Sequence, residues 1–175
     1  MVAKEVAIQH RLRMDIWRPS KRTAIEDEKL KDISIVYYDR GSKKKNSRDI
    51  KCMVLNKFYK RDEVRNSHIW KRATNGSGLE EFNLHESDVS NPRNLLLMCV
   101  SIEKAFDNKQ LCLLVDRIKP EQIYVKILDP SLKAVRVRNE SSSLTFGDID
   151  GYELEHPVGK YPFRRILDFH AKLSF

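Results

Sequence analysis

Long hydrophobic runs are absent from this chain. No apolar segment among its 175 residues approaches the roughly 20 residues that a membrane-spanning helix requires. The opening segment, MVAKEVAIQHRLRMD, carries charges throughout and lacks the apolar centre of a secretory signal peptide. These absences predict a protein without a membrane partner that works in the nucleus or the cytoplasm.

Cysteine, glycine and proline are also scarce. The three cysteines, Cys52, Cys99 and Cys112, are an odd number and include no CxxC pair. They therefore argue against a disulfide framework and exclude a four-cysteine zinc site. Cys99 and Cys112 lie in apolar runs, so we expect both in the core. With 41% apolar and 33% charged residues, the chain has the composition of a globular protein, long enough for one domain with its own core.

Positive charge is concentrated in the first part of the chain. The formal net charge is +8, and residues 1–72 hold 20 Lys or Arg against 10 Asp or Glu, while residues 73–175 hold 13 against 15. Phosphate contacts dominate binding to nucleic acids, so this distribution favours a polyanionic partner. A basic surface that only confers solubility fits the charge equally well.

Sequence periodicity and residue type predict a mixture of strands and helices. Helical patterns appear in TAIEDEKLKD (also readable as a polar connection), in SIEKAFD and in the amphipathic FRRILDFHAKL, where His170 is expected to pack or to cap. A long polar loop with one helical turn is expected over 74–92, and an exposed turn over 41–47. The predicted strands are 33–39, 49–55, a strand ending at 67–69, 94–100, 110–118, 121–129 and 133–138, with part of 6–17 as a further candidate.

Four short motifs follow one another in a specific order: RDIKCMVL (48–55), SHI (67–69), NPRNLLLM (91–98) and EKAFD (103–107). Together they resemble the HNH nuclease family, in particular the group common in fungi and other microbial eukaryotes. DGYEL and FRRILDFHAKLSF are similar to the C-terminal part of such proteins, so the resemblance covers 48–175. Residues 1–47 are then an N-terminal extension, basic at its end, that could belong to the same fold. The resemblance implies an α+β fold with a ββα-metal centre, additional antiparallel strands and a C-terminal helix.

The resemblance assigns roles to two residues near the strand ends. His68 corresponds to the general base, and an imidazole with an ordinary pKa near 6.5 suits proton removal from water. Asn94 corresponds to the central Asn, which ties the loop between the two strands. Leu95 stands where Gly usually follows that Asn. Ser67 stands at the position of a metal ligand in some relatives and is not expected to bind a metal here.

Glu103 marks the clearest departure from the family, because a His is expected at this position. Asp107 follows four residues later, so a helix would place both carboxylates on one face. Carboxylate oxygens suit Mg²⁺ or Mn²⁺ as the metal cofactor. The alternative is that Glu103 marks a degenerate site and that Asp107 is only a helix-end residue.

Basic side chains near these motifs are candidates for contacts to the nucleic-acid backbone: Lys43, Lys44, Lys45, Lys71, Arg72 and Arg93. Such contacts position a protein without reading sequence, so we expect weak sequence preference. Arg93 fits a surface ion pair equally well. Trp70 fits either stacking on a base or packing in the core.

The sequence thus predicts a metal-dependent endonuclease that hydrolyses phosphodiester bonds, with double-stranded DNA as the expected partner. One alternative is a catalytically degenerate HNH-fold module that binds DNA or protein. Another is a basic scaffold that binds an acidic protein.

Overall fold

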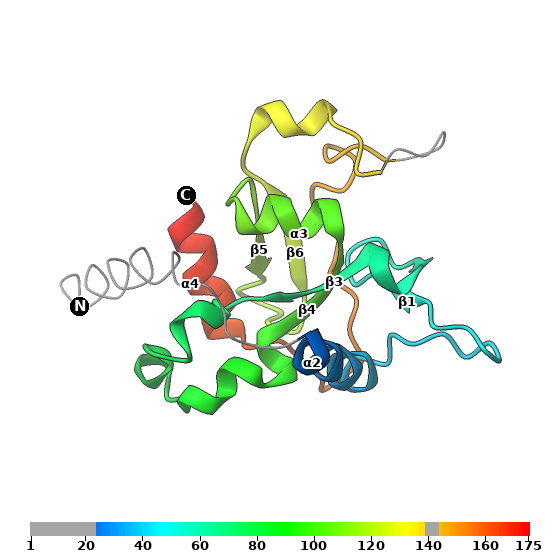
Figure 1. The fold of residues 1–175 in the computed structure, drawn as a ribbon. Coiled ribbons are helices and arrows are strands. Elements are labelled where there is room, and N and C mark those ends of the chain that lie inside the picture. Colours follow the sequence, from blue (N-terminus) through cyan, green and yellow to red (C-terminus); the bar gives the residue numbers. More distant parts are fainter. Residues whose placement is uncertain (1–23, 139–143) are drawn as a thin grey trace.

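The computed structural model describes residues 24–138 and 144–175, which form three helices and three antiparallel strand pairs (Figure 1). The pairs are β1 (Ile50–Lys51) with β2 (Phe58–Tyr59), β3 (Val64–His68) with β4 (Leu95–Cys99), and β5 (Leu111–Val115) with β6 (Ile123–Ile127). The helices are α2 (Ala24–Tyr37), α3 (Val100–Asp107) and α4 (Arg164–Ser174). The predicted α+β class is therefore confirmed. Short 3₁₀ turns connect these elements: η1 (Arg61–Glu63), η2 (Arg72–Thr74), η3 (Leu79–Phe82), η4 (Glu86–Ser90), η5 (Pro92–Asn94) and η6 (Pro130–Ala134).

The β3–β4 hairpin and α3 form the centre of the molecule. The register pairs Val64 with Cys99 at one end and His68 with Leu95 at the other. Every residue of β4 is buried, and α3 starts directly after it with one apolar face turned inward. Two strands followed at once by a helix form a ββα unit, so the expected ββα arrangement is confirmed.

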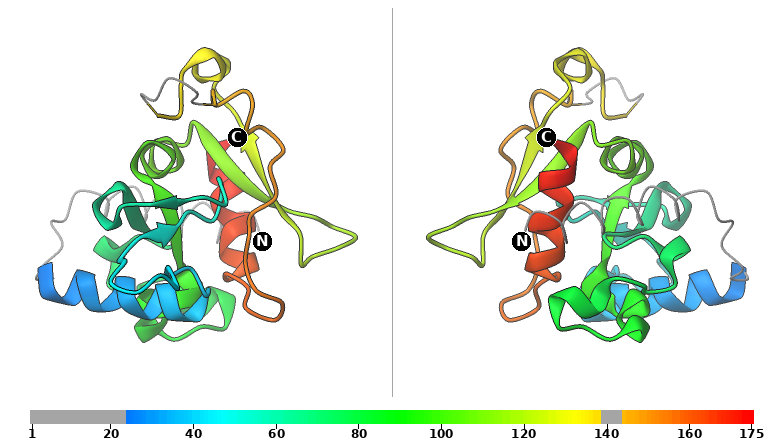
Figure 2. Two further views of the ribbon diagram at one scale, coloured as in Figure 1. Left: turned by 90° about the vertical axis from the view of Figure 1, so that its right-hand side faces the viewer. Right: turned by 90° about the vertical axis from the view of Figure 1, so that its left-hand side faces the viewer.

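Two helices cover this centre from different sides. Figures 1 and 2 show α4 against the β5–β6 pair and α2 below the β3–β4 hairpin.

All three cysteines are buried, as expected for Cys99 and Cys112. None of the helices within the described ranges is both long and apolar enough to cross a membrane.

The predicted strand over 33–39 is wrong, because α2 continues to Tyr37. Its buried side chains, Lys31 and Ser34, are followed by the buried Tyr38, and a spacing of three and four residues is helical. The Tyr38 hydroxyl donates to the Pro92 carbonyl (3.1 Å), which anchors this end on the core. Tertiary packing thus overrides the β propensity of ISIVYY. Since α2 packs on β3 and β4, residues 24–38 share the core with the later segments; the boundary at 47/48 stays a prediction.

The predicted strand over 133–138 is also wrong. Pro130 starts the 3₁₀ turn η6, and the Asp129 side chain accepts from the backbone N–H of Ser131. Among the described residues that follow η6 up to Thr145, strand pairing is limited to an isolated bridge from Arg136 to Thr145.

The expected strand over 49–55 shrinks to Ile50–Lys51, because the chain turns at the left-handed Asn56 (φ 52°). The other expected strands and the helices at 101–107 and 163–173 are confirmed in position, as is the turn within 79–84. The strand candidate within 6–17 lies outside the described residues.

Candidate active site

A cleft of about 640 Å³ opens where the C-terminal end of β3 meets α3 and α4. His68 contributes from β3, Glu103 and Asp107 from α3, and His170 and Lys172 from α4. We call it the His68 cleft. The structure thus brings together the three side chains that the sequence proposed as base and metal ligands, although 35 residues or more separate His68 from the other two.

Asn94 fixes the backbone that leaves β3 just after His68. Its side chain is fully buried, accepts from the Trp70 N–H (2.7 Å), and donates to the carbonyls of Trp70 (3.0 Å) and Val89 (2.9 Å). The Asn94 carbonyl also accepts from the Ile69 N–H (2.9 Å). Asn94 does not line the cleft, and its bonds hold the backbone segment that directly follows His68.

Glu103 is half-buried in the cleft wall. Burial raises the pKa of its carboxyl, and the nearby charge of Asp107 raises it further; Lys71, Arg65 and Lys104 act in the opposite direction. A carboxylate that is desolvated beside a second carboxylate gains from any cation placed between them. Asp107 already has such a cation, because its side chain forms an ion pair with the ammonium of Lys71.

The donor set can be compared with the needs of a metal ion. Within the described residues, no three His, Cys, Asp or Glu side chains gather closely enough to form a protein-only metal site. Mg²⁺ and Mn²⁺ do not need one, since Mg²⁺ commonly uses one or two carboxylates and completes its shell with water and substrate phosphate. The raised pKa of Glu103 beside Asp107 fits such a hard cation. The Lys71 ammonium would have to move from Asp107 for both carboxylates to bind it.

The six basic candidates fall into three places. Lys71 and Arg72 line the His68 cleft, and Arg72 donates to Asp27 on α2 (2.5 Å). Arg93 donates to the Tyr161 carbonyl (3.1 Å), with its guanidinium 4.6 Å from the centre of the Phe163 ring, so it supports the fold. The three lysines of the exposed loop lie far from the His68 end of β3 (Figure 1): Lys43, Lys44 and Lys45.

Trp70 belongs to the core. Its ring lies 5.4 Å from the Phe82 ring and 5.9 Å from the Phe169 ring, and its Nε1 donates to the Ser77 carbonyl (3.1 Å). With 2% of its surface exposed, it has no free face for a base. Between the two readings of Trp70, core packing is therefore correct.

Sequence reasoning missed the part that α4 plays in the cleft. His170 is 7% exposed and stacks on Phe106 with ring centres 4.0 Å apart. Burial lowers its pKa to about 3, with smaller effects from the charges of Lys71 and Lys109, so it is a neutral imidazole at pH 7. The amphipathic pattern predicted the helix and a packed His170, but no local signal placed this helix beside His68.

Buried polar atoms without a hydrogen-bond partner are concentrated at this cleft. Among the described residues that line it, they include Asn66 Oδ1, Ser67 Oγ and His170 Nδ1. Such atoms cost stability and are uncommon in folded proteins, so each of them can accept or donate a bond to a molecule that enters the cleft.

A hairpin followed by a helix, with a histidine at the first strand's end and acids on the helix, defines the ββα class of domain. Residues 52–114, which include β3, β4 and α3, match the model of the HNH endonuclease family. The resemblance to the HNH nuclease family is thereby confirmed over this span, and the family's members are generally nucleases. No significant similarity to a curated protein or to a solved structure was found.

The bonds of Asn94 predict a large cost for its removal. Asn94→Ala leaves the Trp70 N–H and the carbonyls of Trp70 and Val89 buried without partners, so unfolding in urea should show a loss of about 3 kcal/mol or more. The exposed Asn108→Ala, at the end of α3, should stay within about 0.5 kcal/mol of the parent chain. Equal losses in the two variants would contradict this account.

His170 predicts an acid-sensitive stability. Its folded-state pKa lies below its unfolded value near 6.5, so below pH 6.5 the unfolded chain binds a proton that the folded chain does not. The protein therefore has its full stability above pH 6.5 and loses stability as the pH falls toward 3. His170→Phe keeps a ring on Phe106 and removes the titrating group. Between pH 7 and pH 5, the free energy of unfolding should fall by about 2 kcal/mol more in the parent chain than in His170→Phe. Identical pH dependence in urea titrations of the two chains would refute the assignment.

Proposed function

We propose that this protein is a metal-dependent endonuclease that hydrolyses phosphodiester bonds in nucleic acid, with DNA as the expected substrate. The observation that carries the proposal is the placement of His68, Glu103 and Asp107 around one cleft that also holds buried polar atoms without partners. The match of residues 52–114 to the HNH endonuclease family supports it.

Each residue has a defined part in the proposed reaction. His68 removes a proton from a water molecule, and the resulting hydroxide attacks phosphorus while the bond to the leaving oxygen breaks. Asn94 holds the segment after His68 so that the imidazole keeps its direction. Glu103 and Asp107 are the side chains that would hold Mg²⁺ or Mn²⁺, which supplies charge neutralisation at the phosphate and the leaving oxygen.

The cleft also provides for the charge of the substrate. Lys71 and Arg72 lie at its wall, and Lys109 and Lys172 contribute from the neighbouring segments. A phosphate that enters would draw the Lys71 ammonium from Asp107, which frees this carboxylate for the metal ion. None of these contacts reads a base, so weak sequence preference is expected.

Cleavage of a supercoiled plasmid tests this proposal. The intact chain should nick it in Mg²⁺ or Mn²⁺, and His68→Ala should be about 10²- to 10⁴-fold slower, the usual contribution of a general base. His85→Ala, a substitution of an exposed histidine outside the cleft, is the matched control and should keep full activity. Absence of nicking in either metal, or full activity in His68→Ala, would overturn the proposal.

A second candidate function, a degenerate HNH-fold module that binds DNA or protein without cleaving it, is favoured by the Lys71–Asp107 ion pair. In that case the ammonium takes the place of a metal ion permanently. Binding of Mn²⁺, followed by electron paramagnetic resonance without nucleic acid, separates the two candidates.

For the endonuclease, Glu103→Gln should weaken Mn²⁺ binding by about tenfold or more. Lys71→Met should strengthen it, because the competing cation is removed from Asp107. Glu121→Gln, at an exposed carboxylate outside the cleft, should leave the affinity unchanged. Mn²⁺ binding that ignores both cleft substitutions would instead favour the degenerate module.

A further inference from the structure

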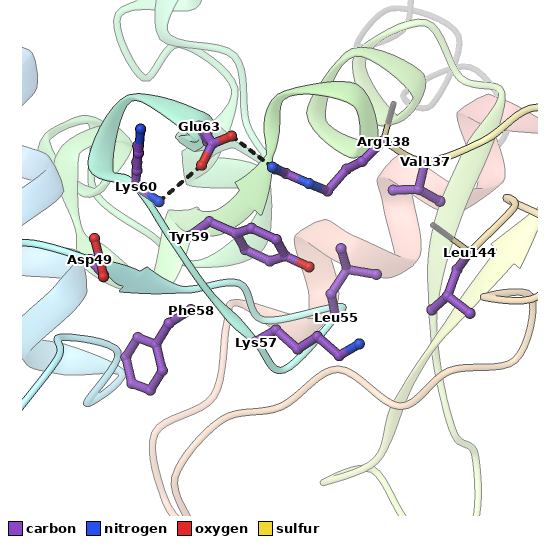
Figure 3. A pocket seen from close by; sticks show the side chains of 10 residues that line it. All are labelled: Asp49, Leu55, Lys57, Phe58, Tyr59, Lys60, Glu63, Val137, Arg138 and Leu144. Carbon is purple, nitrogen blue, oxygen red and sulfur yellow. Dashed lines mark hydrogen bonds and ion pairs between the residues drawn. The ribbon is translucent and has the colours of Figure 1, made fainter. Parts of the chain in front are cut away.

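A second hollow lies on the β1–β2 hairpin, separate from the His68 cleft. Its volume is about 540 Å³, and it is formed between the β1–β2 segment and Val137, Arg138 and Leu144 (Figure 3). We call it the aromatic groove and define it by these lining residues: Leu55, Phe58, Tyr59, Val137, Arg138 and Leu144. Asp49, Lys57, Lys60 and Glu63 complete its lining.

Arg138 contacts both Tyr59 and Glu63 in the lining of the aromatic groove. The Arg138 guanidinium lies 4.2 Å from the centre of the Tyr59 ring, and Arg138 also donates to Glu63 (2.6 Å; Figure 3). The hydrogen bond from Arg138 lowers the pKa of the Glu63 carboxyl, so this acid stays ionised and is neutralised by its partner. The remaining charged side chains of the lining are two lysines against Asp49, so the groove is net positive.

Phe58 stands at the surface of this groove with 49% of its area exposed. It lies between Lys57 and Tyr59-Lys60 in sequence, and the Lys51 ammonium lies 5.8 Å from its ring centre. Single exposed apolar side chains are common, but this ring also has the Lys51 ammonium beside it and lines a groove that holds Lys57 and Lys60. A planar base flanked by two phosphates has the complementary chemistry, since rings stack on bases and lysines contact the backbone.

The aromatic groove and the His68 cleft lie at the two ends of β3. Glu63, in the groove, directly precedes this strand, and His68 ends it, so five residues at about 3.3 Å each separate them by roughly 16 Å. A further hollow at the start of α3 is lined by Asp62, Glu63, Lys104 and Arg138. Lys104 adjoins Glu103, which faces the His68 cleft. The charged side chains of this hollow are thus two acids and two cations, so the link between the two sites rests on their positions at the two ends of β3.

We propose that the aromatic groove binds an unpaired base of a nucleic-acid strand whose backbone continues into the His68 cleft. A base inside a duplex is already stacked on its neighbours, so the exposed Phe58 ring selects strands with unpaired bases. Resting on the proposed function, this names the substrate class: nucleic acid with a single-stranded segment a few nucleotides from the cleaved bond, such as an overhang, a flap or a gap.

Binding in the absence of metal tests this inference independently of cleavage. A fluorescent duplex with a single-stranded overhang and a blunt duplex of equal length are titrated with the full chain in EDTA, with anisotropy as the readout. The parent chain should bind the overhang substrate about tenfold more tightly, the effect of one stacked base, and Phe58→Ala should remove most of that preference. Lys57→Met should weaken both probes equally and reduce the salt dependence by about one ion.

Tyr152→Ala is the matched control, because Tyr152 is an exposed aromatic residue outside the groove; this variant should keep the preference for the overhang. Equal affinity of the parent chain for the two probes, or an overhang preference unchanged in Phe58→Ala, would overturn the inference. So would competition by polyglutamate as effective as that by single-stranded DNA, because polyglutamate carries charge but no bases. None of these outcomes depends on whether His68 supports cleavage.

Discussion

The pair of hydrogen bonds between the Asn94 side chain and the Trp70 backbone is the constraint on which the rest of this structure depends. The Asn94 amide accepts from the Trp70 N–H and donates to the Trp70 carbonyl. These bonds hold the chain that leaves β3 against the chain that enters β4. Both ends are buried, which makes the bonds costly to lose. They fix the hairpin register that sets His68 opposite Leu95, and β4 then delivers α3 with Glu103 toward the same cleft.

Charge in this protein serves the fold as well as any substrate. Arg61 pairs with Glu28 (2.8 Å) and Asp32 (2.7 Å). Arg72 pairs with Asp27. Acids of α2 thus neutralise arginines of the two 3₁₀ turns that flank β3. The net charge of +8 therefore overstates the cations available to a polyanion. The His68 cleft differs because several of its polar groups are buried without enough stabilising contacts. Glu103 is desolvated beside Asp107, and Ser67 and His170 each have a buried polar atom without a hydrogen bond.

Local sequence patterns predicted the helices and strands whose hydrophobic spacing or apolar run lies within the element itself. The apolar run of β4, the helix with Glu103 and Asp107, and the amphipathic α4 were all expected where they occur. The strand over 33–39 failed because β-branched residues there sit on a helix whose Tyr38 end is anchored to Pro92, a contact across 54 residues. The Lys71–Asp107 pair and the arrival of α4 beside His68 are long-range in the same way, so no segment of sequence contains them. Motif order placed His68 and Glu103 in one site, whereas the groove around Phe58 and Arg138 needed the fold to join distant segments.

The central claim is that His68 acts as a base in a cleft that still performs chemistry. Chemical rescue of His68→Ala by free imidazole during Mn²⁺-dependent plasmid nicking tests it most directly, because the small-molecule base can enter the space that the side chain vacates. The account predicts nicking that returns with added imidazole and rises with its unprotonated fraction. Nicking by His68→Ala that ignores imidazole, or an intact chain that never cleaves, would contradict it.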